Sequence, residues 1–176
     1  NYTIEGYLFP DTYEFPVDVQ PEQVIRIMAA RFNSLIPARY EQSSQKDRYS
    51  LHQVVTMASI VEKEAVKQDE RARIAGVFYS RLRLQMNLES CATVQYILGA
   101  PRKLYFVDLE IVSPYNTYRN PGLPPGPIAS AGLASIEAAL NPEEHDYLFF
   151  VAKSDGSHIF SKTYNQHLSA IQQARR

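Results

Sequence analysis

The sequence has no tryptophan, a single cysteine (Cys91) and no run of about 18 apolar residues that could cross a membrane. One cysteine excludes an internal disulfide. The four histidines are scattered without metal-ligand spacing, and no Walker-type loop, G-x-S-x-G motif or dinucleotide fingerprint occurs. A net charge of −1 gives no electrostatic reason to expect nucleic acid. We therefore predict no metal, no cofactor and no nucleic-acid partner.

What the chain does contain is ordinary for a folded domain. Its 176 residues are 45% hydrophobic and 21% charged, which is enough for one domain with a core. The chain opens without methionine on Asn1-Tyr-Thr-Ile-Glu-Gly6, which already has the character of folded sequence. We expect residues 1–176 to be a single domain of a longer protein.

Hydrophobic periodicity and capping residues predict a mostly helical chain. Helices are expected to begin at Pro21, Ser50, Asp69 and about Thr163, with shorter ones over 93–98 and, after a Ser130 cap, over 131–140. Short apolar strands over 147–152 and 158–161 flank a turn and predict a β-hairpin. The fold class is therefore α+β: mostly helical, with a small antiparallel sheet that includes this C-terminal β-hairpin and the start of the chain.

The most informative stretch is Met57-Ala-Ser-Ile-Val-Glu-Lys-Glu-Ala65, which places Glu62 and Glu64 in an apolar helical pattern. At about 100° per residue, Glu62 lies roughly 65° and Glu64 roughly 95° from the centre of the apolar stripe. Glu62 is thus expected at the shoulder of the buried face, where desolvation raises a carboxyl pKa toward the range of a general acid. Residues two apart do not face each other, so the two are not a tight carboxylate pair. The alternative is a solvated Glu-Lys-Glu edge.

A second feature is the loop of residues 113–128, which is rich in proline and glycine. It presents Tyr115, Asn116, Thr117 and Tyr118, and stiff loops of this kind concentrate ligand contacts. Asparagine and threonine can hydrogen-bond sugar hydroxyls or acetamido groups, and tyrosine can stack on a pyranose face. The alternative is a structural loop whose asparagine caps a turn.

Two isolated side chains have competing interpretations. Arg81 is a candidate for binding a substrate carboxylate, although a surface salt bridge is the commoner fate of an arginine. Cys91 is followed by no evident base, which favours a buried, inert thiol over a nucleophile.

Seven ordered motifs carry a resemblance to a known family. They are Glu5-Gly-Tyr-Leu-Phe-Pro-Asp-Thr-Tyr13, Met57-Ala-Ser-Ile-Val-Glu-Lys-Glu64, Val77-Phe-Tyr-Ser-Arg-Leu82, Thr93-Val-Gln-Tyr96, Tyr115-Asn-Thr-Tyr118, Gly122-Leu-Pro-Pro-Gly-Pro-Ile128 and Tyr147-Leu-Phe-Phe-Val151. Over essentially the whole chain they resemble the YceG-like family of endolytic murein transglycosylases. The resemblance implies internal cleavage of peptidoglycan strands between N-acetylmuramic acid and N-acetylglucosamine, leaving 1,6-anhydro ends without a cofactor.

The resemblance also implies roles for particular residues. It places the catalytic glutamate on Glu62. The expected substrate groove consists of the four loop residues and Arg81 named above, together with Glu64, Thr93 and Gln95. Many members have aspartate in L-Q-S-D-P-T-V where this chain has Cys91. We expect that position to be structural and not a second acid.

The resemblance further implies a cellular context. A full-length member adds a short cytoplasmic part, one membrane helix and a LysM-like lobe. We therefore expect an extracytoplasmic domain, anchored to the membrane by one N-terminal helix outside this chain. Peptidoglycan synthases and other cell-wall elongation or division proteins are its expected partners.

The expected mechanism uses one residue twice. Glu62 protonates the glycosidic oxygen and then, as a carboxylate, takes the proton from the sugar 6-hydroxyl that closes on the anomeric carbon, while Tyr115 and Asn116 position the sugar. The alternatives are a non-catalytic peptidoglycan-binding scaffold, a hydrolytic muramidase with two carboxylates, and a pyridoxal-phosphate enzyme of the aminodeoxychorismate lyase kind. The last would use Lys63, but the sequence offers no phosphate loop beside it.

Overall fold

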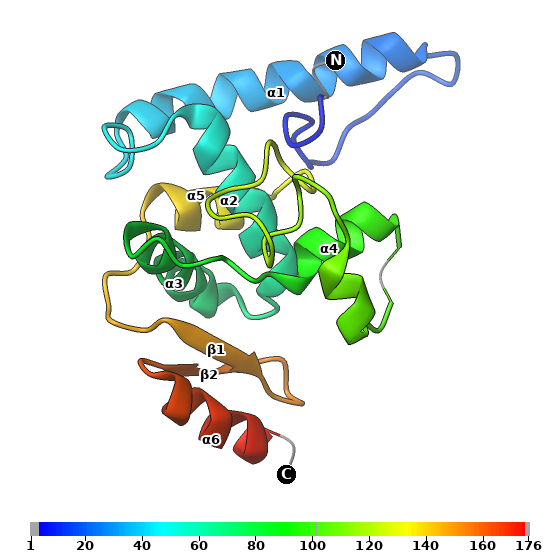
Figure 1. Ribbon diagram of the computed structural model, residues 1–176. Helices are drawn as coiled ribbons and strands as arrows, with labels where there is room; N and C mark the ends of the chain where they lie inside the picture. Colours follow the sequence, from blue (N-terminus) through cyan, green and yellow to red (C-terminus); the bar gives the residue numbers. More distant parts are fainter. Residues whose placement is uncertain (1–3, 101, 175–176) are drawn as a thin grey trace.

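The computed structural model describes residues 4–100 and 102–174. Within them the chain forms six α-helices, two short 3-10 helices (η1 and η2) and one two-stranded antiparallel sheet, which confirms the α+β class (Figure 1). None of the helices in these ranges is both long and apolar enough to cross a membrane. In chain order the elements are α1 (Pro21–Glu41), α2 (Leu51–Glu64), η1 (Gln68–Glu70), α3 (Arg71–Arg83), α4 (Cys91–Leu98), η2 (Phe106–Glu110), α5 (Leu133–Leu140), β1 (Phe149–Ala152), β2 (His158–Ser161) and α6 (Tyr164–Ala174).

Helix α2 forms the centre of the core. Ser50 caps its start as predicted, because the Ser50 hydroxyl accepts the Gln53 backbone N–H at 3.3 Å and the Gln53 side chain accepts the Ser50 N–H at 2.9 Å. Every residue from 54 to 61 is buried. A helix buried on all sides is held by its neighbours, and each fully buried aliphatic side chain contributes roughly 1.5–3 kcal/mol to that packing. The core thus fixes the direction in which α2 presents its last turn.

Three helices pack around α2, namely α3, α4 and α5, while α1 lies across its N-terminal end (Figure 1). Helices α3 and α5 are joined by a hydrogen bond from the Tyr79 hydroxyl to the Ala139 carbonyl at 3.0 Å. Gly76 lets α3 approach the segment after α5, since a Cβ at this position would collide with the Glu143 carbonyl. These contacts fix α3 and α5 relative to the end of α2.

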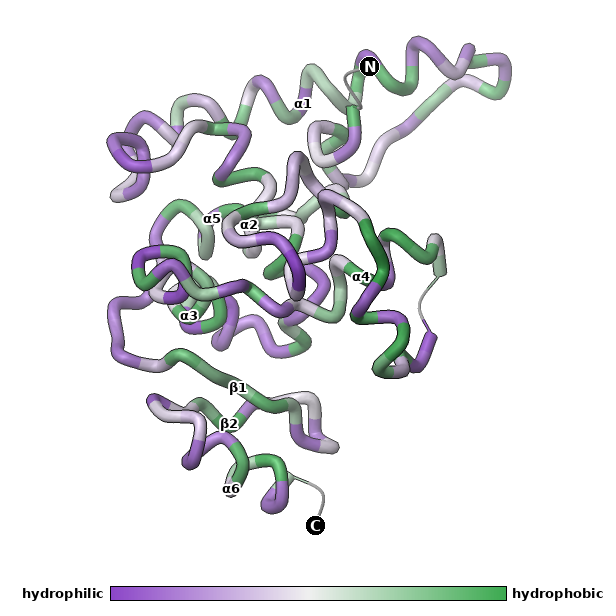
Figure 2. The backbone as a smooth tube through the Cα atoms, in the orientation of Figure 1, coloured by the Kyte–Doolittle hydropathy of each residue, from purple (hydrophilic) through white to green (hydrophobic). Residues whose placement is uncertain are grey.

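The β-hairpin and α6 form a separate layer beyond α3 (Figure 1). Strands β1 and β2 are antiparallel, with Phe149 opposite Ser161 and Ala152 opposite His158. Figure 2 shows that β1 is apolar along its length. Phe150 of β1 meets Phe78 of α3 edge-on, with ring centroids 5.7 Å apart, and α6 packs against both strands. This layer therefore faces the same end of the core toward which α2 points.

Several element boundaries differ from the sequence predictions. Among the described residues the sheet contains only the hairpin, because the start of the chain consists of turns and extended segments without strand pairing. Helix α3 begins at Arg71 after a 3-10 turn and has no side-chain cap, so the predicted Asp69 start is wrong. Helix α5 begins after Gly132, and Ser130 does not cap it. Helix α4 begins at Cys91, two residues earlier than the predicted range, so Cys91 stands in its first turn.

Candidate functional site

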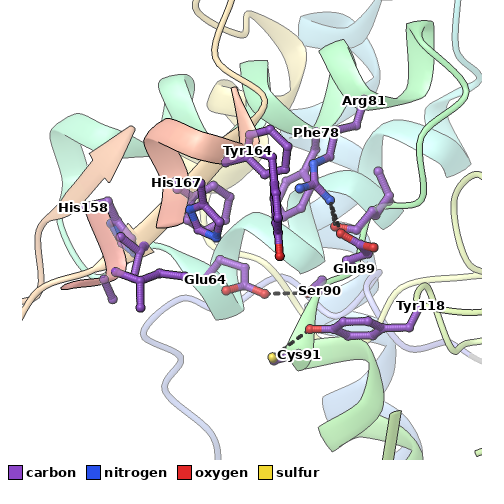
Figure 3. Close-up of a pocket in the computed structure, with 16 residues that line it drawn as sticks. Glu64, Phe78, Arg81, Glu89, Ser90, Cys91, Tyr118, His158, Tyr164 and His167 are labelled. Carbon is purple, nitrogen blue, oxygen red and sulfur yellow. Dashed lines mark hydrogen bonds and ion pairs between the residues drawn. The ribbon is translucent and has the colours of Figure 1, made fainter. Parts of the chain in front are cut away.

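The last turn of α2 opens onto a cavity of about 480 Å³, within the usual size range of ligand pockets. Glu64, the final residue of α2, lies between two walls (Figure 3). Ser90, Cys91 and Tyr118 form one wall, and the hairpin and α6 form the other. The polar lining consists of Glu64, Arg81, Glu89, Ser90, Cys91, Tyr118, His158, Tyr164 and His167, and Phe78, Phe149 and Phe150 are among its apolar members.

Glu64 is the desolvated carboxyl group of this cavity. Burial raises its pKa above the ordinary value, and hydrogen bonds from the Ser90 hydroxyl and the Ala92 backbone, with the nearby His158, offset part of that rise. The Ser90 hydroxyl donates to Glu64 Oε1 at 2.5 Å. The position at the C-terminal end of α2 also disfavours a negative charge, because the helix dipole is negative there. A carboxyl group so placed holds its proton to higher pH than an exposed glutamate does and can give that proton to a ligand in the cavity.

Glu62, the acid expected from the sequence, lies outside this cavity. Its Oε2 accepts the backbone N–H of Gly132 at 3.2 Å, the residue that precedes α5. A carboxylate at a helix N-terminus is favourably placed against the dipole, so Glu62 stabilises the start of α5. The angle from the apolar stripe does not identify the desolvated carboxyl group, because α2 is buried on every side from residue 54 to residue 61. Helix α2 has no solvent face over these residues. Which carboxyl group is desolvated therefore depends on the segments that cover the last turn of the helix.

Thr93 and Thr117 support Ser90 and do not line the cavity. Their hydroxyls are 2.9 Å apart, Thr93 Oγ1 donates to the Ser90 carbonyl at 2.8 Å, and the Ser90 N–H donates to Thr117 Oγ1 at 3.1 Å. Both threonines are buried. The prediction that they contact substrate is therefore wrong, and their role is to fix the hydroxyl that holds Glu64.

Asn116 is fully buried, with 0% of its surface exposed, and it too cannot reach a ligand. Its amide donates to the carbonyls of Leu109 and Ile111 at 2.9 and 2.8 Å, and its Oδ1 accepts the Tyr118 N–H at 3.0 Å. The expectation that Asn116 positions a sugar is contradicted. The structural alternative for this loop is correct, since its asparagine stabilises turns and thereby places Tyr118 in the cavity.

Arg81 lies in the cavity wall, but most of its donors serve the fold. Its guanidinium donates to the carbonyls of Leu148, Asn87 and Leu88 at 2.7–3.1 Å and to Glu89 Oε2 at 3.0 Å. The side chain is only 8% exposed. Neither sequence interpretation describes this arrangement, in which a buried cation joins α3 to the hairpin and neutralises the second carboxylate of the cavity.

Tyr118 and Cys91 meet in the cavity with 3.1 Å between Oη and Sγ. Burial raises the pKa of the Tyr118 phenol well above its ordinary value, so the hydroxyl stays protonated and can donate. Cys91 is exposed, which overturns the expectation of a buried thiol. Because Cys91 lines the cavity beside Ser90, its side chain can contact a ligand that binds to Glu64.

Tyr115 and Gln95 lie away from Glu64. The Tyr115 ring packs against Tyr96 with centroids 4.9 Å apart, and Gln95 donates to the Arg102 carbonyl at 3.2 Å. Gln95 instead lines a second cavity of about 340 Å³, together with Lys63 and Tyr96. Of the residues predicted to bind substrate, the main cavity brings together Glu64, Arg81 and Tyr118 only.

The hairpin and α6 contribute residues that the sequence analysis did not identify. His158 of β2 bonds through Nδ1 to the buried Glu70 at 2.8 Å, while Tyr164 and His167 of α6 line the cavity opposite Ser90 (Figure 3). No local motif marks these side chains. The sequence indicated only that His158 lies in the predicted hairpin and His167 in the predicted helix that follows it.

The chemistry that this arrangement supports is proton transfer to and from a polar ligand. One carboxyl group of raised pKa is surrounded by hydroxyl and aromatic groups that can bind a sugar. Over residues 4–100 and 102–174, no group of three or more histidine, cysteine, aspartate or glutamate side chains is placed to hold a metal ion.

Comparisons with known proteins point to one family. The YceG-like family model matches residues 1–173. The chain is 46% identical over 171 residues to the endolytic murein transglycosylase of Bacillus subtilis (strain 168), covering 96% of this chain and 47% of that protein. It is 36% identical over 173 residues to the endolytic murein transglycosylase of Streptococcus pneumoniae serotype 2 (strain D39 / NCTC 7466), covering 94% and 31%. The 2.6 Å crystal structure of a YceG-like protein from Listeria monocytogenes matches with a TM-score of 0.88 and 47% identity, covering 94% of this chain and 55% of that one. The chain thus spans only part of each of these longer proteins.

Proposed function

Because the chain belongs to the YceG-like family, we propose that it is the catalytic part of a lytic transglycosylase that cleaves peptidoglycan strands internally. The bond cleaved joins N-acetylmuramic acid to N-acetylglucosamine. The observation that carries this proposal is the placement of Glu64, a carboxyl group of raised pKa in a cavity lined by hydroxyl and aromatic side chains. We assign the acid to Glu64 in place of Glu62, because Glu62 lies outside the cavity and bonds to Gly132.

The proposed reaction uses Glu64 in two steps. Its protonated carboxyl group first donates to the glycosidic oxygen, so that the bond to the anomeric carbon breaks and N-acetylglucosamine leaves with a free hydroxyl. The carboxylate then takes the proton of the muramic acid 6-hydroxyl as that oxygen bonds to the anomeric carbon. The product carries a 1,6-anhydro ring, no water is consumed, and the acid is regenerated. Breaking a carbon–oxygen bond without water makes the enzyme a lyase.

The electrostatics of the cavity fit a single acid/base. The raised pKa of Glu64 favours the protonated carboxyl group, which donates the proton. The Ser90 hydroxyl can stabilise the carboxylate that then forms. Tyr118, on the same wall, offers a neutral donor for a sugar hydroxyl or an acetamido oxygen. The aromatic ring of Tyr164 offers an apolar face for a pyranose ring.

A hydrolytic muramidase remains a second candidate because the cavity contains another carboxylate. Retaining and inverting hydrolases use two such groups, one as the acid and the other as nucleophile or base. Glu89 is that second carboxylate, but its Oε2 is bound to Arg81 at 3.0 Å. We therefore assign Glu89 to neutralising Arg81. Product analysis separates the two reactions: transglycosylation yields anhydro ends, whereas hydrolysis yields reducing ends.

The cellular context is part of the same proposal. We propose that the domain works outside the cytoplasm, held at the membrane by an N-terminal helix of the longer protein, and that it acts together with peptidoglycan synthases. A non-catalytic scaffold that only binds glycan is the competing assignment. The test is incubation of the protein with purified sacculi, followed by mass spectrometry of the soluble fragments. Anhydro-ended fragments support the transglycosylase, reducing ends support the hydrolase, and binding without release supports the scaffold.

A further inference from the structure

We propose that His167 of α6 is a glycan-binding residue that hydrogen-bonds an N-acetyl sugar held over Glu64; this inference rests on the proposed function. His167 lines the cavity and lies with Tyr164 on the side opposite Ser90 and Tyr118 (Figure 3). Its Nδ1 atom is buried and, among the described residues, has no hydrogen-bond partner. No other buried side-chain nitrogen or oxygen in that part of the chain is left unpaired.

The imidazole ring is held in place by packing. It stacks on Phe149 with ring centroids 5.3 Å apart and planes 22° apart, and Tyr164 lies next to it at 6.5 Å. An unpaired buried polar group costs about 1–3 kcal/mol, so proteins seldom keep one without a partner. Since His167 lines the Glu64 cavity, a small rotation of the ring on Phe149 would expose Nδ1 to that cavity, and a ligand bound there is then its natural partner.

The charge state of His167 indicates what kind of ligand group it meets. Burial lowers its pKa, as does the Arg81 cation, and the Glu89 carboxylate counteracts them in part. The other titratable groups that line the cavity are Glu64, Cys91, Tyr118, His158 and Tyr164. The neutral imidazole has one donor and one acceptor nitrogen, which suits the hydroxyl and acetamido groups of an amino sugar. A neutral ring also avoids adding positive charge beside the oxocarbenium-like transition state of glycoside cleavage.

This contact gives α6 a direct function. Glu64 approaches the sugar from the end of α2, Tyr118 from the long loop, and His167 from the C-terminal helix. The ligand would thus be held between the core and the hairpin–α6 layer. His167 would orient the sugar relative to the Glu64 carboxyl group, so that its loss lowers both binding and turnover.

The test uses three substitutions that separate packing from hydrogen bonding. His167→Phe keeps an aromatic ring on Phe149 without a nitrogen, His167→Asn places an amide atom near the position of Nδ1, and His167→Gln places one near Nε2. Release of soluble fragments is measured against sacculus concentration, giving kcat and apparent KM. Gln172→Ala, an exposed residue of the same helix, is the matched control.

We expect His167→Phe to lower kcat/KM roughly tenfold or more, because a sugar hydroxyl is left unpaired, without lowering Tm. His167→Asn should keep more activity than His167→Gln, since the unpaired atom is Nδ1. Wild-type kcat and KM in His167→Phe would overturn the proposal. Equal losses in the Phe and Asn variants would overturn it as well.

A binding measurement makes this result independent of turnover. Imidazole nitrogen shifts of His167 are recorded in the Glu64→Gln variant while a soluble N-acetylglucosamine–N-acetylmuramic acid tetrasaccharide is added. We expect the Nδ1 resonance to move at saturation, and no movement at saturation contradicts the contact. Wild-type turnover in Glu64→Gln would defeat the assignment of Glu64 as the acid, and a wild type that releases no anhydro fragments would defeat the proposed function. In either case the shift would still report whether His167 meets the glycan.

Discussion

The Ser90 hydroxyl donates a 2.5 Å hydrogen bond to Oε1 of Glu64, joining the segment before α4 to the last residue of α2. Behind it, Thr117 and Thr93 bond to the backbone of Ser90. Glu89, the residue before Ser90, has φ of 52°, a left-handed conformation uncommon outside glycine, and its N–H bonds to the Thr117 carbonyl. One carboxyl group is thus oriented by a chain of buried hydrogen bonds, as a general acid requires.

Ser90→Ala should alter the pH profile as well as the rate. The Ser90 bond lowers the pKa of Glu64, so its removal raises that pKa further. In the proposed mechanism the protonated carboxyl group is the active form, so activity should fall as pH rises through the pKa of Glu64. The alkaline limb of the profile should therefore move to higher pH, while the maximal rate drops roughly tenfold through lost orientation. Ser169→Ala, an exposed serine of α6, is the control. An unmoved alkaline limb in Ser90→Ala would contradict this account.

Glu64→Gln should stabilise the protein in alkaline but not in acidic solution. The folded-state pKa of Glu64 is raised above its unfolded value, so the carboxyl group favours folding at low pH and this contribution is lost as pH rises through the folded pKa. Glutamine is neutral throughout and avoids the loss. Urea unfolding at pH 8 should give the variant a larger free energy of unfolding than the wild type, with the difference shrinking toward pH 4. A variant less stable than the wild type at pH 8 refutes the desolvation argument.

Asn116→Ala should destabilise the fold without touching the chemistry. The substitution leaves the carbonyls of Leu109 and Ile111 without their donor in a partly buried loop, at a cost of about 2–3 kcal/mol. Asn120→Ala is a matched control, since Asn120 also donates to two carbonyls but is exposed and should cost about 0.5 kcal/mol. Chemical denaturation measures both. If Asn116→Ala keeps wild-type stability and loses affinity for glycan, the loop binds substrate after all.

Cys91 offers a chemical handle on the cavity. It is exposed beside Tyr118, and it is the only cysteine of the chain. We expect Cys91→Ala to keep activity within about threefold, because the thiol contributes one weak hydrogen bond. Alkylation with iodoacetamide should inhibit the wild type by filling the cavity and leave Cys91→Ala unaffected. Full activity of the alkylated wild type would show that the ligand does not pass this wall.

The elements that depend on local sequence were predictable from the residues alone. The Ser50 N-cap was predicted because a serine stands directly before an apolar helical run, and the structure adds Gln53 as its capping-box partner. The short helix predicted over 93–98 ends before Gly99, which adopts φ of 73°, the left-handed conformation that glycine favours at the end of a helix. The hairpin was recognised from the turn between two apolar runs.

The orientation of side chains in the site could not be predicted in the same way. The polar loop residues Asn116 and Thr117 were expected to face a ligand, but both are turned inward to hold turns and Ser90. His167 reaches the cavity only because α6 packs on the hairpin and the hairpin on α3. Such placement depends on contacts between distant segments, which neither periodicity nor spacing encodes.

Glu62→Gln is the natural partner of Glu64→Gln, because the two residues share a helix turn and differ in environment. It should stay active and lose about 0.3–1 kcal/mol of stability, since its carboxylate accepts the Gly132 N–H at the start of α5. Thermal unfolding measures the stability change. An inactive but folded Glu62→Gln variant would return the catalytic role to Glu62.

The measurement that tests the central claim most directly is mass spectrometry of fragments released from purified sacculi by the wild type, Glu64→Gln and Glu62→Gln, each confirmed as folded. We predict 1,6-anhydro fragments from the wild type and from Glu62→Gln, and none from Glu64→Gln. Anhydro fragments from Glu64→Gln in wild-type amounts would contradict the assignment of Glu64 as the acid/base.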